Sequence, residues 1–233
     1  SVVITAFPAF CLSVVASDVL SRPKEEIMVL FRRTNEEMAN TWTHFIGFLY
    51  AVLTSWVLIW LGSRIGWQMT LGVCIFAFGM MMMYGSSALY HWVVRQDVKR
   101  VLRKFDHISI FVMIAASYTP ICIGVVGGVL GWTMFAVQWA LVLAGVFYKV
   151  FALGRWPALS LGIYLTMGWS VVFVIKPVFL AMNMLSVACV IAEGVFYTAG
   201  TYFYVHDRQR KYYHAVWHVF VLLGSLAHWL AVL

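Results

Sequence analysis

The chain has 233 residues, of which 63% are hydrophobic and only 11% are charged, and its mean hydropathy is +0.89. This balance excludes an ordinary soluble domain and is typical of an integral membrane protein. The formal net charge of +7 could suggest a nucleic-acid partner, but the basic residues lie between long apolar segments, so we expect no such partner.

Seven apolar segments follow one another along the chain, and each is close to the length of about 20 residues that a helix needs to cross a bilayer. They span residues 43–61, 67–94, 108–126, 130–150, 158–175, 178–205 and 212–233. Thr34 and Glu37 form a capping-box pattern, which predicts a helix that begins there and continues into the first segment. The sequence therefore predicts an all-α, seven-helix membrane domain over residues 36–233. We assign residues 1–35 to an N-terminal cytoplasmic or interfacial segment.

The positive charges indicate how this bundle lies in the membrane. Of the 16 Lys and Arg residues, only Arg64 and Lys176 fall on one side of the seven predicted helices. The others precede the first helix, fill a predicted loop at 95–106, or flank two further connections on the same side. Cytoplasmic loops carry this excess, so we expect the N-terminus in the cytoplasm and the C-terminus outside. We expect the protein in the cytoplasmic membrane, with membrane lipids as its partners.

This topology brings polar residues from several helices to one side of the membrane. His91 ends the second segment, and His214 and His218 open the seventh, four residues apart and so on one helix face. Three imidazoles that leave a coordination position open are typical of a catalytic zinc site. We therefore predict one zinc ion at these histidines. Asp106 opens the third segment and would accept a proton or orient a water molecule; Ser87, one turn before His91, would hydrogen-bond the substrate or the nucleophile.

The remaining polar residues of the apolar segments have several interpretations. His44 is either a fourth metal ligand or a hydrogen-bonded partner of the site, and we favour the partner. His107 is expected to serve the interface. Glu193 lies about 18 Å from the cytoplasmic end of its helix, either hydrogen-bonded within the bundle or facing a hydrated cavity. His228 lies about 15 Å beyond His218 along its helix, so we expect a satisfied polar contact there and no metal binding.

Several separated motifs resemble those of bacterial hemolysin III proteins. They are EEMANTWTH at residues 36–44, SALYH at 87–91 with FDH at 105–107, SYTP at 117–120, the Gly194, Tyr197 and Gly200 pattern, and HAVWH at 214–218. That family belongs with the progestin and adipoQ receptors and more distantly resembles alkaline ceramidases. The resemblance implies a seven-helix bundle with its N-terminus inside and zinc at His91, His214 and His218. Ser87 and Asp106 match further site positions, whereas Phe45 replaces a usual glycine.

Three functions are compatible with these features. The open three-histidine site predicts a zinc-dependent hydrolase that acts on an amide or ester of a membrane lipid. The alternative is a non-catalytic sensor or regulator of membrane lipid state or energetics, in which zinc is structural and His44 completes the site. A pore-forming haemolysin is disfavoured, because one acid near the middle of the membrane and no ring of charges offer little for ion conduction.

Overall fold

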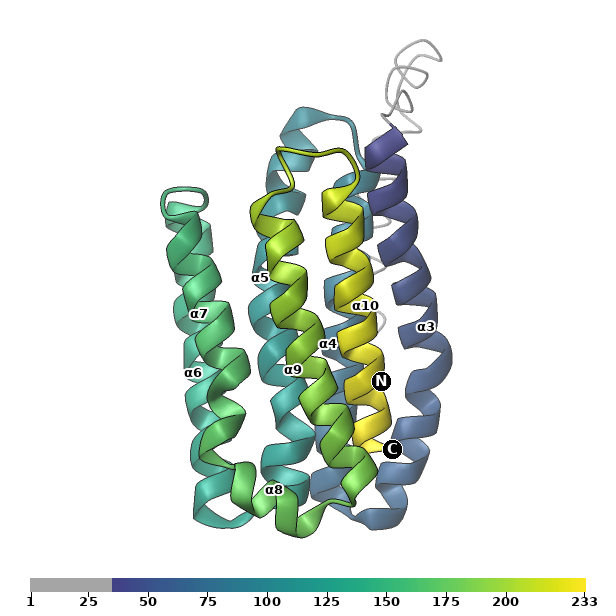
Figure 1. Cartoon of the computed structure of the whole chain (residues 1–233), viewed down its shortest axis with the longest axis vertical. Helices are drawn as coiled ribbons and strands as arrows, with labels where there is room; N and C mark the ends of the chain where they lie inside the picture. The colour runs from purple at the N-terminus through teal and green to yellow at the C-terminus, as the bar shows by residue number, and fades with distance from the viewer. Residues whose placement is uncertain (1–34) are drawn as a thin grey trace.

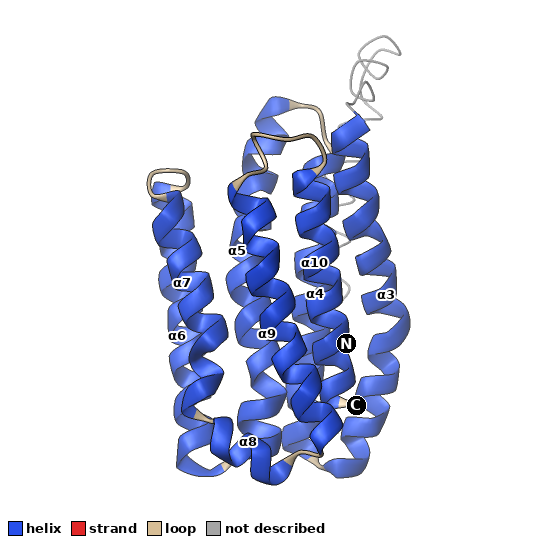
Figure 2. Ribbon diagram, in the orientation of Figure 1, coloured by secondary structure: helices blue, strands red, loops and turns tan. Residues whose placement is uncertain are grey.

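A computed structural model describes residues 35–233, whose regular secondary structure is entirely helical (Figures 1 and 2). The elements are α3 (Asn35–Ile65), α4 (Trp67–Trp92), α5 (Gln96–Thr119), η1 (Pro120–Val126), α6 (Gly128–Ala152), α7 (Pro157–Trp169), η2 (Ser170–Phe173), α8 (Ile175–Ala181), α9 (Met184–Val205) and α10 (Tyr213–Val232). The capping residue Thr34 and the N-terminal segment predicted before it lie outside the described residues.

The helices have the length and composition of membrane spans. Six of the described helical segments are long and apolar enough to cross a membrane, and the pair formed by Pro157–Phe173 and α8, bent by 56°, supplies a seventh if it counts as one span. Large apolar side chains such as Trp56, Phe147 and Leu180 are exposed on the outside of the bundle, where lipid would cover them. The prediction of a multi-pass helical membrane bundle is confirmed.

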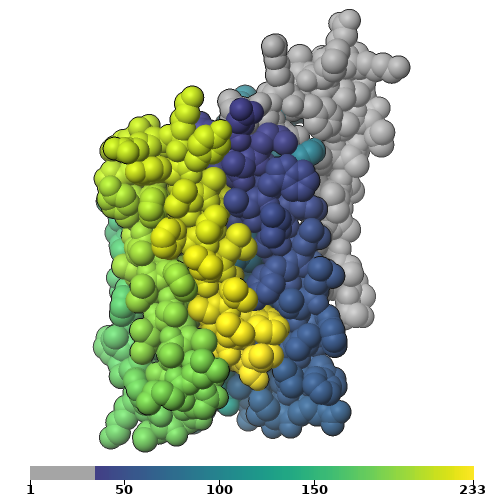
Figure 3. All heavy atoms as spheres, turned by 45° about the vertical axis from the view of Figure 1, so that its right-hand side comes forward, coloured from purple at the N-terminus to yellow at the C-terminus, as the bar shows by residue number. Residues whose placement is uncertain are grey.

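The bundle closes through the last helix. α3 packs along α4, α4 along α5, and α9 along α10, while α10 also packs against α3. α6 packs against α5, and α7 contacts both α5 and α9 (Figure 1). In the space-filling view, α10 lies at the surface between α9 and α3 (Figure 3). Residues near the two ends of the chain therefore meet, which is what brings motifs far apart in sequence to one site.

The third span continues through a proline. Pro120 follows Thr119 without ending the helical path, and residues Pro120–Val126 adopt a π-helix that extends α5. Proline lacks a backbone N–H and commonly disturbs the helical ladder where it stands. Gly72 of α4 faces this point, and a Cβ there would lie 2.5 Å from the Pro120 Cα. The glycine thus lets α4 and the π-helical segment approach closely.

The predicted loop at 95–106 is wrong, because α5 already begins at Gln96. Arg100 and Arg103 are exposed in these first turns, while Leu102 is buried. Such an arrangement is that of an amphipathic helix. The density of charge marks where the chain leaves the apolar part of the bundle, and it does not mark the end of the helix.

The predicted sixth segment, 178–205, is broken. α8 ends at Ala181, Met182 has an extended backbone, and α9 starts after Asn183. The Asn183 side chain accepts a hydrogen bond from the backbone N–H of Ser186 at 2.9 Å, as a favourable N-cap residue does. The short α8 thus connects α7 to α9 across the end of the bundle that carries Arg64 and Lys176 (Figure 1).

Candidate metal site

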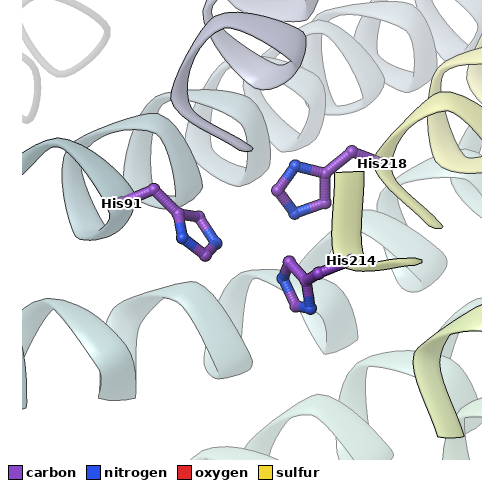
Figure 4. Close-up of side chains that lie close together, drawn as sticks. All are labelled: His91, His214 and His218. Atoms are coloured by element: carbon purple, nitrogen blue, oxygen red, sulfur yellow. The ribbon is translucent and has the colours of Figure 1, made fainter. Parts of the chain in front are cut away.

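Three histidines converge at the end of the bundle where α4 finishes and α10 begins. His91 is the penultimate residue of α4, and His214 and His218 lie in the first two turns of α10 (Figure 4). One ring nitrogen of each lies within 4.8 Å of those of the other two. The ring centroids are 5.0 Å apart for His91 and His214, 5.2 Å for His91 and His218, and 4.7 Å for His214 and His218. The structure thus brings together the three residues that the sequence singled out.

A carboxylate from the first helix fixes the orientation of His91. Nδ1 of this imidazole donates a hydrogen bond to Oε2 of Glu37 at 2.7 Å, and Lys99 donates to the other oxygen, Oε1, at 2.7 Å. A carboxylate accepts only, so the proton of the neutral imidazole must be on Nδ1. The lone pair of Nε2 is therefore free, and this atom is buried without a hydrogen-bond partner within residues 35–233.

His218 is oriented by the same helix through neutral groups. Its Nδ1 lies 3.0 Å from the Thr43 hydroxyl oxygen and 3.2 Å from the Asn40 carbonyl oxygen. The Thr43 hydroxyl itself donates to the Ala39 carbonyl oxygen at 2.9 Å, which leaves its oxygen to accept from the imidazole. His218 is only 1% exposed. Its proton is thus placed on Nδ1, and Nε2 again keeps the lone pair.

His214 is oriented by an acid in the preceding turn. Its Nδ1 lies 3.0 Å from Oδ2 of Asp207, and both side chains are 26% exposed. All three imidazoles therefore use Nδ1 for a protein acceptor and leave Nε2 for another ligand. A metal-binding histidine usually has its second ring nitrogen held in this way.

The residues present fit a small metal ion. Zinc–nitrogen bonds are about 2.0–2.1 Å long, so three nitrogens on one tetrahedral ion lie about 3.4 Å apart. The three ring nitrogens lie within 4.8 Å of one another, and inward rotation of the rings would bring them to this spacing. Within the described residues, the group contains these three histidines and no fourth His, Cys, Asp or Glu. The donor set of three imidazoles suits zinc and the late first-row metals.

Ser87 and Asp106 are the other two residues that the sequence assigned to this site. Ser87 is buried at 2% exposure one turn before His91. Asp106 is half-buried in α5 and lies within electrostatic range of Tyr90, the neighbour of His91. It is not part of the ligand group, which leaves it available for another role.

His44 differs from the expectation of a hydrogen-bonded partner. Its ring stacks on that of His218, with centroids 3.5 Å apart and an angle of 14° between the planes. Both of its ring nitrogens are buried without a hydrogen bond to the described residues. The edge of the Tyr84 ring packs on it at 5.2 Å. His44 thus supports the His218 ring by contact, and His107 lies outside the group as expected.

Sequence reasoning missed the residues that hold the imidazoles in place. Glu37 and Asn40 lie within a motif that we had matched only as a pattern, and Asp207 lies in the connection before α10. A usable signal existed for Glu37, because it sits two turns before His44 on the helix that faces the site. For Asp207 no periodicity was available, since the connection at 206–212 is not a regular helix.

Comparison with known proteins identifies the family. A family model described as Haemolysin-III related matches residues 32–229. The hemolysin-3 homolog of Bacillus subtilis (strain 168) is 36% identical over 200 residues, which cover 85% of this chain and 93% of its own. Hemolysin-3 of Bacillus cereus is 30% identical over 210 residues, 90% and 95% of the two chains. The human monocyte to macrophage differentiation factor is 25% identical over 206 residues, 84% and 83% of the two chains. This chain therefore belongs to the Haemolysin-III related family of multi-pass membrane proteins, as its motifs predicted.

Proposed function

We propose that the protein binds one zinc ion through Nε2 of His91, His214 and His218 and hydrolyses an amide or ester bond of a membrane lipid. The observation that carries this proposal is the convergence of three imidazoles whose Nδ1 atoms are all engaged elsewhere. Structural zinc sites normally have four protein ligands, whereas catalytic sites keep a position open. The three-residue group supports the catalytic alternative.

Zinc in such a site polarises a carbonyl group and makes water nucleophilic at neutral pH. The protein itself would supply the proton acceptor and the positioning of the substrate. Asp106 is half-buried and not a member of the ligand group, so its carboxylate is free to take up the proton that water loses on attack. It would then return that proton to the departing amine or alcohol of the lipid.

Ser87 would orient the scissile carbonyl. Its side chain is buried one helical turn from His91, and its hydroxyl would donate to a substrate oxygen. A hydroxyl at this place favours a substrate that presents an acceptor there. Amide and ester carbonyls both provide one.

The class of substrate follows from where the site lies. Exposed apolar residues cover the outside of the helices, and the histidines stand at the end of the bundle where most lysines and arginines gather. A lipid in the surrounding layer would present its polar linkage near that level, while its acyl chains remain among the apolar helices. The positive charge of this end supports a position on the cytoplasmic side of the cell membrane.

Metal content is the first test. Elemental mass spectrometry on detergent-purified protein should find about one zinc per chain in the wild type and none in His91→Ala or His214→Ala. His206→Ala is the matched control, because His206 lies near the same end but outside the ligand group. Zinc retained by both ligand variants would mean that the ligands are wrong. No metal even after reconstitution with zinc would end the hydrolase proposal.

A second measurement separates an enzyme from a sensor that uses zinc only structurally. Asp106→Asn should keep its zinc and lose the hydrolysis of lipid amides or esters in a liposome assay. If the wild type and Asp106→Asn both hold zinc and neither releases a product from any lipid offered, the protein is a sensor or regulator. Release of a dye from liposomes by wild type and His91→Ala alike would instead indicate a pore.

A further inference from the structure

A second polar site lies deeper in the bundle than the histidine group. Glu193 of α9 and His228 of α10 are both buried, with side chains 12% and 1% exposed. Nδ1 of His228 donates a hydrogen bond to Oε2 of Glu193 at 2.7 Å. The ten residues between His218 and His228 correspond to about 15 Å along α10. The pair is therefore separate from the three histidines that we propose as metal ligands.

Several polar atoms around this pair have no partner. Nε2 of His228, the hydroxyl groups of Tyr50 and Tyr197, and Nε1 of Trp229 are buried without a hydrogen bond to the described residues. Tyr197 lies within electrostatic range of Glu193 and Tyr50, and the rings of Tyr50 and Trp229 are 6.4 Å apart. Buried polar groups are nearly always hydrogen-bonded, in many cases to an ordered water molecule. Four exceptions in one region indicate that water belongs there.

Among the described residues, no lysine or arginine balances the Glu193 carboxylate. Within residues 35–233 the only ion-pair partner of Glu193 is His228. Among the described residues, the phenols of Tyr118 on α5 and Tyr197 on α9 interact with Glu193, and those of Tyr50 on α3 and Tyr84 on α4 interact with Tyr197. Cys189 lies one turn before Glu193. On the remaining side, the ring of Phe76 on α4 packs against His228 at 4.6 Å. An unbalanced charge is costly inside a membrane protein, so the proton that neutralises Glu193 has to reside on the pair itself.

We propose that Glu193 and His228 form a buried proton-binding site, in which the two side chains share one exchangeable proton and Tyr197 and Nε2 of His228 hold water. The ligand of this site is the proton, with water as the species that delivers it. The site joins α9 to α10, the helix that also carries two of the three histidines at its other end. This proposal does not depend on metal binding or on hydrolysis.

Infrared spectroscopy of the full chain in liposomes tests the proposal directly. Spectra between about pH 4 and about pH 9, the range that spans ordinary carboxyl and imidazole titration, should contain a carboxyl band that changes with pH and shifts within minutes in D2O. Glu193→Gln should remove this band, because the amide preserves the shape and the hydrogen bond but cannot titrate. Asp97→Asn is the control, since Asp97 is an exposed acid paired with Arg95, and this variant should keep the band.

Each outcome decides the proposal. A spectrum of Glu193→Gln identical to that of the wild type, or a Glu193 band that does not exchange in D2O, would overturn it. If Glu193→Gln fails to fold, His228→Gln replaces it: the transition of the Glu193 band should move to higher pH by about 1–3 units, since an opposite charge close by has been removed. An unmoved transition would equally overturn the proposal. We also expect Glu193→Gln to contain as much zinc as the wild type, so that a change in its infrared spectrum does not reflect damage to the histidine group.

Discussion

Two carboxylate–imidazole pairs with the same geometry stand at different depths in this bundle, and their surroundings differ. Glu37 with His91, and Glu193 with His228, both have a distance of 2.7 Å between the carboxylate oxygen and Nδ1. Glu37 also accepts from Lys99 at 2.7 Å, whereas Glu193 has no such cation within the described residues. The same pair of side chains can therefore serve two purposes, depending on what balances the acid.

Where a lysine shares the acid, the imidazole keeps its second ring nitrogen for another ligand. The ammonium group of Lys99 donates to Glu37, and Nε2 of His91 has no hydrogen bond to the described residues. In our proposals the first arrangement orients a metal ligand, and the second, which has no lysine among the described residues, binds a proton.

The largest expected difference comes from removing one histidine of each group from the same helix. His218→Ala should abolish stoichiometric zinc binding, because two remaining imidazoles cannot complete the site. His228→Ala should leave the zinc content at about one per chain, since His228 lies about 15 Å further along α10. Elemental analysis of both variants, purified in the same detergent, measures this contrast. Equal zinc loss in the two variants would show that the sites are not separate.

Exchanging each acid for its amide sharpens the comparison. Glu37→Gln keeps the size of the side chain but weakens the hold on His91, and the loss of such an orienting partner typically lowers metal affinity by about 10–100-fold. Glu193→Gln should leave the affinity unchanged. Competition with a chromogenic chelator gives both values. A Glu37→Gln affinity within twofold of the wild type would remove the orienting role that we assign to Glu37.

Much of the fold was accessible from the sequence, because hydrophobic length is a strong signal in a membrane. The errors arose where another feature competed with it. Charges at Lys99 and Arg103 suggested a loop, although a helix can continue past the apolar layer with its charged side in water. The chain breaks between α8 and α9 at Asn183, inside an apolar run with no proline or charged residue at that point. A single polar residue such as this N-cap is a weak signal for a helix boundary within a long apolar segment.

The histidines were predictable for a topological reason, and their partners were not. Alternating helix directions place the end of α4 and the start of α10 at one side, so His91 and His214 had to share a level. Helix rise placed Glu193 near the middle of the membrane and His228 towards its outer face, and depth does not say which faces meet. Only the packing of α9 along α10 pairs them. Asp207, in an irregular connection, offered no pattern at all.

Thermal stability should show how much the hydrogen bond between Glu193 and His228 contributes to the fold. Glu193→Ala leaves Nδ1 of the buried His228 without an acceptor, and an unsatisfied buried polar group costs about 1–3 kcal/mol. For a chain of this size, each 1 kcal/mol lowers Tm by about 2–4 °C. Glu193→Gln should cost less, because its amide oxygen can still accept. Thermal unfolding in detergent, followed by circular dichroism, compares the two. A Glu193→Ala variant as stable as Glu193→Gln would mean that the hydrogen bond adds no stability.

The smallest effect is expected at the outer edge of the histidine group. Asp207 and His214 are each 26% exposed and their atoms are 3.0 Å apart, whereas His91 is 5% and Glu37 31% exposed and their atoms are 2.7 Å apart, so the two pairs differ in the burial of the imidazole. Water can replace part of the bond that Asp207 provides, and exposed pairs are worth only about 0–1 kcal/mol. Asp207→Asn should therefore lower zinc affinity by only about fivefold or less, and by less than Glu37→Gln. Salt should also affect the two variants differently, because the charges of a more exposed pair are screened more strongly than those of a more buried one. Zinc affinities measured at low and high ionic strength test this ranking. A larger loss of affinity in Asp207→Asn than in Glu37→Gln would contradict it, because burial of the imidazole would then not decide how firmly a carboxylate orients that ring.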